Sequence, residues 1–375
     1  MTDVVRVTEA ARTVPLVDHH CHGVAVAELN RAGVERLISE GGAPPEGDTN
    51  FDTPIGLAIR RHCAPLLDLE PHASAADYLA RRAELGTAEV NRRLLGATGT
   101  SRYLVDTGHD PAGLTTPEEV AGLTGAAADH VVRLEHVAEE LAAEGVGAAA
   151  FGAAFAERLA ATVKEVGAVG VKSVAAYRTG LRLAPERPTT AEVAAAASGW
   201  LGGGGERMAH PVLQRATLWA AVDLGLPIQF HVGFGDSDIR MSEVDPTLLT
   251  DWIRRHRVPV MLLHCWPWHR QASYLACIYP HVHLDVGSVL HYVGPRRGAE
   301  VLAEAAEVTP FGRLLYSSDA YGAPELYTLG ALGFRSALEA MLTDRVGSGE
   351  WAAADAERFA HLVAHGNAER VYRLG

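Results

Sequence analysis

Residues 14–23 read Val14-Pro-Leu-Val-Asp-His-His-Cys-His-Gly23, an apolar run that leads into three histidines. The run from Val14 to Val17 is typical of a buried strand, and the glycine ends it. Side chains alternate between the faces of a strand, so we expect His20 and His22 on one face and His19 on the other. Two imidazoles on one face can bind the same cation. The alternative is that these histidines are hydrogen-bonded residues of the core.

The composition is that of a globular protein that acts on a small molecule. Of the 375 residues, 48% are hydrophobic and 21% charged, and the net charge is −13. The chain has no basic stripe, which argues against nucleic acid or an anionic membrane as a partner. The four cysteines show no paired spacing, and the first residues resemble neither a signal peptide nor a membrane span, so we expect a reduced, cytoplasmic protein. A homo-oligomer is compatible with the sequence.

Eight short apolar runs, separated by helical segments, are expected as strands. The first lies in residues 14–23, and the others are 102–108, 130–135, 168–173, 227–231, 258–264, 282–287 and 313–319. The clearest helical patterns are 75–85, 87–95, 116–128, 148–166, 190–200 and 211–224. Near-continuous apolar strands that alternate with helices are typical of a parallel sheet covered by helices.

This pattern predicts an α/β fold, a (β/α)₈ TIM barrel. We expect residues 1–375 to form one domain, with a helical insertion at about residues 25–99, after the first strand. An open, doubly wound sheet is the alternative, but no GxGxxG motif opens a helix.

Histidine, lysine and aspartate occur where five of the expected strands end, and in a barrel these ends face one mouth, where active sites are built. They are His20 and His22 on the first strand, Lys172 on the fourth, His231 on the fifth, His264 on the sixth and Asp319 on the eighth. Imidazole and carboxylate suit Zn²⁺, Mn²⁺ or Fe²⁺, and such a site with an open position activates water. Taken alone, each residue has a structural alternative. A single histidine at a strand end is more often hydrogen-bonded than bound to a metal, and Asp319 can merely cap a loop.

Several longer motifs resemble the amidohydrolase superfamily (amidohydrolase 2 type), and within it the FluG/nodulin-like branch. They are Val171-Lys-Ser-Val-Ala-Ala-Tyr-Arg-Thr-Gly-Leu181, Gln229-Phe-His-Val-Gly-Phe-Gly-Asp236, Gln271-Ala-Ser-Tyr-Leu-Ala276, Leu284-Asp-Val-Gly287 and Ser317-Ser-Asp-Ala-Tyr-Gly-Ala-Pro-Glu325. In that branch the barrel is often fused to a glutamine-synthetase-like domain.

The resemblance implies His20, His22, His231 and Asp319 as the metal ligands, with zinc as the expected ion. Asp319 would also act as the general base toward the activated water. His264 would either complete a second metal site or act as an acid/base and oxyanion-stabilising group.

Lys172 decides how many ions the resemblance implies. In binuclear relatives a lysine at this position is carboxylated and bridges two metals. Its alternative here is an ammonium that pairs with Asp319 or holds a substrate carboxylate. We expect one ion, because the rest of the sequence resembles the mononuclear relatives.

Three further residues are expected to contact the substrate. Arg178 follows Lys172, and its guanidinium can hold a carboxylate with two hydrogen bonds, although it can equally be a surface arginine. After the sixth strand the chain departs from the family. Where a small residue followed by Tyr-Pro-Phe is expected, it reads Cys265-Trp266-Pro267-Trp268, with tryptophans in place of the tyrosine and the phenylalanine. These tryptophans would narrow the pocket, or pack against the insertion.

The expected function is hydrolysis of a C–N bond in a small carboxylated substrate, such as a γ-glutamyl-type amide. Non-oxidative decarboxylation and sugar-acid isomerisation occur in related branches on the same scaffold and are the first alternative, because a fold does not determine a reaction. A binding protein without catalysis is the second.

Overall fold

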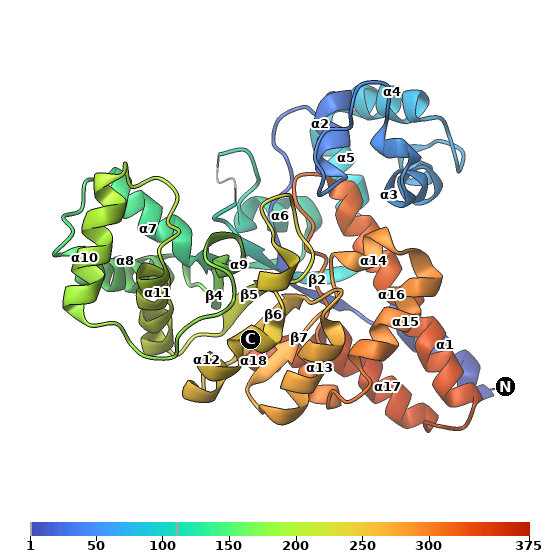
Figure 1. The fold of residues 1–375 in the computed structure, drawn as a ribbon. Coiled ribbons are helices and arrows are strands. Elements are labelled where there is room, and N and C mark those ends of the chain that lie inside the picture. Colours follow the sequence, from blue (N-terminus) through green and yellow to red (C-terminus); the bar gives the residue numbers. More distant parts are fainter. Residues whose placement is uncertain (1, 110–111) are drawn as a thin grey trace.

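The centre of the molecule is a curled, fully parallel sheet with strand order β1-β2-β3-β4-β5-β6-β7. The structure is a computed structural model, which describes residues 2–109 and 112–375 (Figure 1). The strands are β1 (Leu16–Cys21), β2 (Thr100–Asp106), β3 (Ala127–Arg133), β4 (Gly170–Ser173), β5 (Ile228–Val232), β6 (Val260–His264) and β7 (Val282–Leu284). Every residue of β1, β4, β5, β6 and β7 is buried, as the apolar runs predict for strands covered on both faces.

The predicted eighth strand, residues 313–319, forms no regular strand, which corrects the sequence-based expectation. Its backbone nevertheless lies between β7 and β1: the Leu315 N–H donates to the carbonyl of Leu284, and the His19 N–H donates to that of Tyr316. The Asp18 carboxylate accepts hydrogen bonds from the N–H and hydroxyl of Ser318, replacing a backbone partner. Asp319 then has a φ of 53°, which strand geometry does not allow. The segment therefore bonds to both edges of the sheet as irregular backbone.

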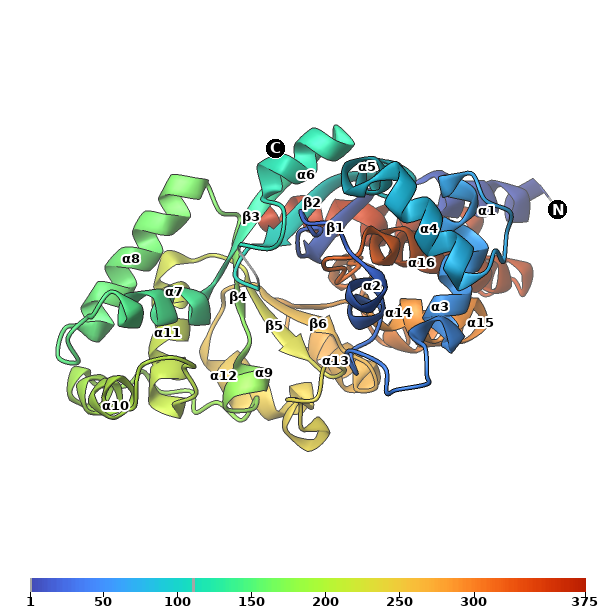
Figure 2. The same ribbon diagram turned by 90° about the horizontal axis from the view of Figure 1, so that it is seen from above.

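Helices surround the sheet, and many begin at recognisable capping residues. Thr116 and Thr189 each form a capping box with the glutamate three residues later, and α6 (Pro117–Thr124) and α10 (Thr190–Gly202) begin there. The remaining helices on the outside of the strands are α1 (Thr2–Thr13), α7 (Leu134–Ala143), α8 (Phe151–Val166), α9 (Ala175–Arg178), α11 (Pro211–Leu224), α12 (Thr250–Arg255), α13 (His269–Ile278), α14 (Val289–Tyr292), α15 (Gly294–Ala305), α16 (Pro324–Gly347), α17 (Ala353–His361) and α18 (Asn367–Tyr372). Seen from above, α7, α8, α10 and α11 gather at one end of the sheet (Figure 2).

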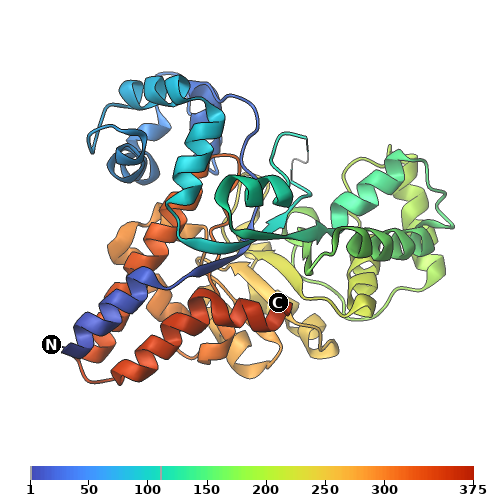
Figure 3. The ribbon, with the colours of Figure 1, turned by 180° about the vertical axis from the view of Figure 1, so that it is seen from behind.

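On the back of the molecule, the N-terminal helix α1 lies beside α16 and α17 (Figure 3). Arg12 of α1 donates two hydrogen bonds of 2.7 Å to Glu339 of α16. Among the described residues, no helix is long and apolar enough to cross a membrane.

The stretch between β1 and β2 is helical, as its sequence predicts. It contains α2 (Arg31–Leu37), α3 (Pro54–Ala58), α4 (Ala75–Leu85), α5 (Thr87–Gly96) and short 3₁₀ and π turns. These helices form a lobe at one side of the strands, drawn in blue and cyan (Figure 1). A buried ion pair joins the lobe to α16: Arg82 Nε donates to Glu325 Oε1 at 2.6 Å, and the Tyr78 hydroxyl donates to the same oxygen at 2.7 Å.

The largest boundary difference concerns residues 116–135. The sequence predicts a helix over 116–128 and a strand over 130–135, whereas α6 ends at Thr124 and β3 spans Ala127–Arg133. Gly125 ends the helix because its φ of 72° suits a glycine C-cap, and the alanines that follow extend the strand rather than the helix.

Candidate metal centre and cavity

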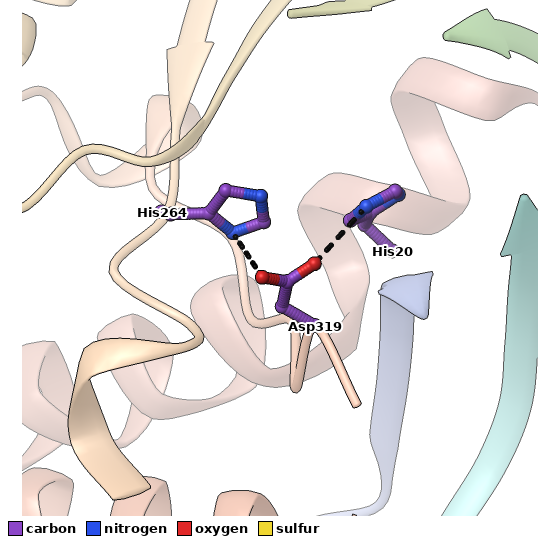
Figure 4. Close-up of side chains that lie close together, drawn as sticks. All are labelled: His20, His264 and Asp319. Atoms are coloured by element: carbon purple, nitrogen blue, oxygen red, sulfur yellow. Dashed lines mark ion pairs between the residues drawn. The ribbon is translucent and has the colours of Figure 1, made fainter. Parts of the chain in front are cut away.

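Asp319 lies among three histidine rings at the mouth of the sheet. Its Oδ1 is 3.3 Å from His20 Nε2 and 3.6 Å from His22 Nε2. Its other oxygen, Oδ2, is 3.3 Å from Nδ1 of His264 (Figure 4). Two strand ends, those of β1 and β6, and the irregular eighth segment thus bring their ligand-type atoms together, as the sequence predicts for a metal centre.

The donor set fits a divalent cation. His264 is fully buried, and neither of its ring nitrogens has a hydrogen-bond partner, nor does Nδ1 of the buried His20. Buried nitrogens without partners are costly, and coordination of a metal would satisfy one ring nitrogen of a histidine such as His264. His20, His264 and Asp319 offer atoms that all lie within 4.8 Å of one another.

His231 lies beside this group but outside its tightest part. Its ring centroid is 4.7 Å from that of His264, and its Nε2 is 3.0 Å from the carbonyl oxygen of Phe234. A carbonyl only accepts, so Nε2 carries the proton and Nδ1 retains the lone pair that a metal needs. Of the predicted ligands, the structure therefore brings His20, His22 and Asp319 together. His264, which was expected either in a second metal site or as an acid/base group, also lies next to Asp319.

Asp106, which the sequence analysis did not single out, orients His22. The Nδ1 of His22 lies 3.3 Å from the Asp106 carbonyl oxygen and donates to it, which leaves Nε2 directed at Asp319. Burial raises the pKa of the Asp106 carboxyl, but the charge and hydrogen bonds of Arg133 hold it below its ordinary value. His20, His22 and Asp106 form a second group with metal-ligand spacing. Arg133 already donates to both carboxylate oxygens of Asp106, which favours the group around Asp319.

Asp285 holds the backbone of His264 in place. Its Oδ1 accepts from the His264 N–H at 2.9 Å and from the Gly287 N–H at 2.8 Å, while its Oδ2 lies 2.9 Å from His19 Nε2. His264 has a φ of 66°, a conformation that is costly for a residue with a side chain. The network also explains the alternation in β1, because His19 points away from the metal ligands toward Asp285 and Tyr372.

Lys172 lies at the base of the same group. Its side chain is 1% exposed, and its Nζ is 2.9 Å from His20 Nε2. Burial lowers the pKa of Lys172 to about 8, against the opposing effect of the Asp106 and Asp319 carboxylates. The ammonium form and the neutral amine are therefore both accessible near neutral pH.

A cavity of about 460 Å³ opens above these residues. Of the predicted substrate contacts, Arg178 lines it, whereas Trp266 and Trp268 do not. The ring of Trp266 packs against Phe234 instead, with centroids 5.7 Å apart. The lining comprises His22, Glu40, Gly108, His109, Arg133, His136, Glu139, Lys172, Val174, Tyr177, Arg178, Arg207, His231, Asp236, Asp238, Asp319 and Tyr321.

Some of these lining residues carried a signal in the sequence. Arg133 is the last residue of β3, and Asp106, next to the cavity, is the last residue of β2. Polar residues at the carboxyl ends of barrel strands are expected at the active site, so both could have been selected from the sequence. Glu40 lies in the insertion, about 280 residues before Asp319, and nothing in its local sequence places it in the cavity.

Comparisons with known proteins agree with this geometry. A family model described as amidohydrolase matches residues 17–374. Protein fluG of Emericella nidulans is 28% identical over 420 residues, covering 97% of this chain and 46% of that protein, so the chain spans about half the length of this curated relative.

Solved structures show the same fold. A protein of Lactobacillus casei ATCC 334, provisionally named a metal-dependent hydrolase, superposes with a TM-score of 0.83 at 29% identity, over 98% of this chain and 97% of that one. The uronate isomerase of Thermotoga maritima reaches 0.69 at 13% identity, over 99% and 97% of the two chains, and at that identity the likeness concerns the fold alone. Because the family model spans nearly the whole sequence, the chain belongs to the amidohydrolase family.

Proposed function

We propose that this protein is a metal-dependent hydrolase of a C–N bond in a small carboxylated amide. The observation that carries the proposal is the position of the Asp319 carboxylate, within 3.6 Å of nitrogens from three histidines at the base of a cavity. A divalent ion held by His20, His22, His231 and Asp319 would activate water and polarise a carbonyl group. The family supports this reaction class, but neither the fold nor the ligands determine the bond that is cleaved.

The protein's own residues supply the proton transfer. Burial raises the pKa of Asp319 to about 7, and the charge of Lys172 opposes this rise. The Asp319 carboxylate, beside the ion that it would help to hold, would accept a proton from an attacking water and return it to a leaving amine. His264 is 3.3 Å from Asp319 and lies where it can stabilise negative charge on the substrate oxygen.

Arg178 supports the carboxylate part of the proposal. It makes one hydrogen bond of 3.1 Å, from a terminal nitrogen to Glu139, and its buried Nε has no partner. The guanidinium therefore has donors left for a second carboxylate. A screen of γ-glutamyl amides with the metal-loaded protein tests the proposal, and a parallel screen of uronates tests for isomerisation. Turnover of uronates without release of amine or ammonia from any amide would contradict it.

Replacing Arg178 with methionine is expected to cost the carboxylated substrate on the order of 2 kcal/mol in transition-state binding, because a remote charged contact helps orient the scissile bond. The measurement is kcat/KM for that substrate and for its carboxamide analogue, in wild type and variant. Arg182→Met, at an exposed arginine just after α9 that does not line the cavity, is the control. Equal losses for the acid and the amide would show that Arg178 serves the fold.

One metal ion per chain is expected, because an ammonium on Lys172 repels a second cation. Elemental analysis of protein prepared with and without bicarbonate measures this number. Lys164→Met provides a control for carboxylation at the only other lysine, which is exposed. A second ion that appears with bicarbonate in this control, and not in Lys172→Met, would show that Lys172 is carboxylated.

A further inference from the structure

Two acidic side chains in the cavity, Glu40 and Asp236, have no cationic partner among the described residues. The three arginines of the cavity are already matched. Their ion pairs are Arg133 with Asp106 at 2.6 Å, Arg178 with Glu139 at 3.1 Å and Arg207 with Asp238 at 2.9 Å. The wall formed by Glu40 and Asp236 is therefore acidic, and each of the cavity's three arginines pairs with a different carboxylate.

The charge on this wall affects Glu40 itself. Burial, together with the nearby carboxylates of Asp319 and Asp236, raises the pKa of Glu40 to about 8. A buried carboxyl that lies near other acids favours its neutral form. A positively charged group placed there would stabilise the ionised form of Glu40.

Aromatic rings complete the wall. Tyr177 and Tyr321 line the cavity, and their ring centroids are 4.5 Å from that of His231 and 6.4 Å from that of His22. The chain passes Tyr177 so closely at Gly235, the residue before Asp236, that a side chain there would overlap the tyrosine hydroxyl. Carboxylates beside aromatic rings are the surroundings that bind organic ammonium groups.

A second metal ion is a poorer match for this wall. In the part of the chain that the structure describes, two groups of histidine and acidic residues have metal-ligand spacing, and neither includes Glu40 or Asp236. A primary ammonium needs no such convergence of atoms, because it binds through three separate hydrogen bonds and through the faces of rings.

We propose that Glu40 and Asp236 select a substrate whose amine portion carries a second, positively charged amino group. The inference rests on the proposed function and deepens it: the substrate class becomes an amide with a carboxylate at one end and an ammonium at the other. Arg178 ends α9 and Glu40 follows α2, so the two side chains reach the cavity from different elements. Three of the proposed ligands, His22, His231 and Asp319, line the same cavity, so a substrate anchored at both ends would pass over them.

The test compares binding of n-butylammonium and of 1-butanol, two molecules of similar shape, to the metal-loaded protein by ligand-observed NMR titration. Wild type is expected to prefer the ammonium by about tenfold or more, and Glu40→Gln and Asp236→Asn should each remove most of that preference. Asp238→Asn is the matched control, since Asp238 lines the same cavity but already pairs with Arg207, and it should leave the preference unchanged. Thermal unfolding and metal content of each variant report whether the fold and the metal centre are intact.

Equal binding of the two probes by wild type would overturn the inference, as would a preference that survives in both Glu40→Gln and Asp236→Asn. The titrations need no turnover, so their failure would leave the proposed hydrolysis standing. If the protein selects ammonium but cleaves no amide, the proposed hydrolysis is wrong and the ammonium-binding role of Glu40 and Asp236 remains supported. Once a substrate is found, kcat/KM for amides of butylamine and of 1,4-diaminobutane should differ in wild type and converge in Glu40→Gln.

Discussion

Asp319→Asn is expected to lower kcat by about a thousandfold or more, because an amide cannot accept the proton of the attacking water and is a weaker metal ligand. The substitution preserves the shape of the side chain, so the contacts with His20 and His264 remain geometrically possible. Turnover and bound metal, measured on the same preparation, separate the two causes. Asp223→Asn is the control, since Asp223 is exposed, pairs with the exposed Arg187 and does not line the cavity. Activity retained within a factor of about ten would remove Asp319 from the chemistry.

Arg82→Met is expected to lower the free energy of unfolding by about 3–5 kcal/mol, because it leaves the fully buried Glu325 carboxylate without its cation. The two residues form hydrogen bonds of 2.6 and 3.2 Å, with the arginine 7% exposed. Urea unfolding measures the loss. Arg81→Met is the matched control, since its partners Asp68 and Glu84 are exposed, and it should cost at most about 1 kcal/mol.

The pH dependence of this pair provides a second check. Burial raises the pKa of Glu325, but the charge and hydrogen bonds of Arg82 outweigh it and leave the pKa below its ordinary value. A carboxyl with a depressed pKa adds stability that is present above its unfolded pKa and is lost as the pH falls through the folded value. The difference in stability between wild type and Arg82→Met should therefore shrink in acid. A difference that stays constant down to acid unfolding would contradict the ion-pair explanation.

The strands and the clustering of ligand-type residues could be predicted because both depend on local patterns. Short apolar runs that end in histidine, lysine or aspartate identify strands and, through the common mouth of a barrel, bring His20, His264 and Asp319 together. The predicted alternation in β1 is confirmed, because His20 and His22 face Asp319 while His19 faces Asp285. The helical character of residues 75–85 and 87–95 is confirmed by α4 and α5.

What the sequence did not predict depends on contacts between distant segments. The eighth segment loses strand geometry because the Asp18 side chain takes the Ser318 N–H and because Asp319 turns into the left-handed region. Glu40 enters the cavity from the insertion, whose position depends on tertiary packing such as that of Arg82 against Glu325. The predicted substrate contacts at Trp266 and Trp268 stay predictions, although neither lines the cavity.

We expect His20, His22, His231 and Asp319 to hold one catalytic metal ion. The most direct test is a crystal structure of the purified protein with anomalous diffraction data on both sides of the zinc, iron and manganese absorption edges. We expect a single anomalous peak within about 2.0–2.3 Å of nitrogens of His20 and His22 and of an Asp319 oxygen. A structure without a peak at this position, or with its peak bound by Asp106 instead of Asp319, would contradict the account.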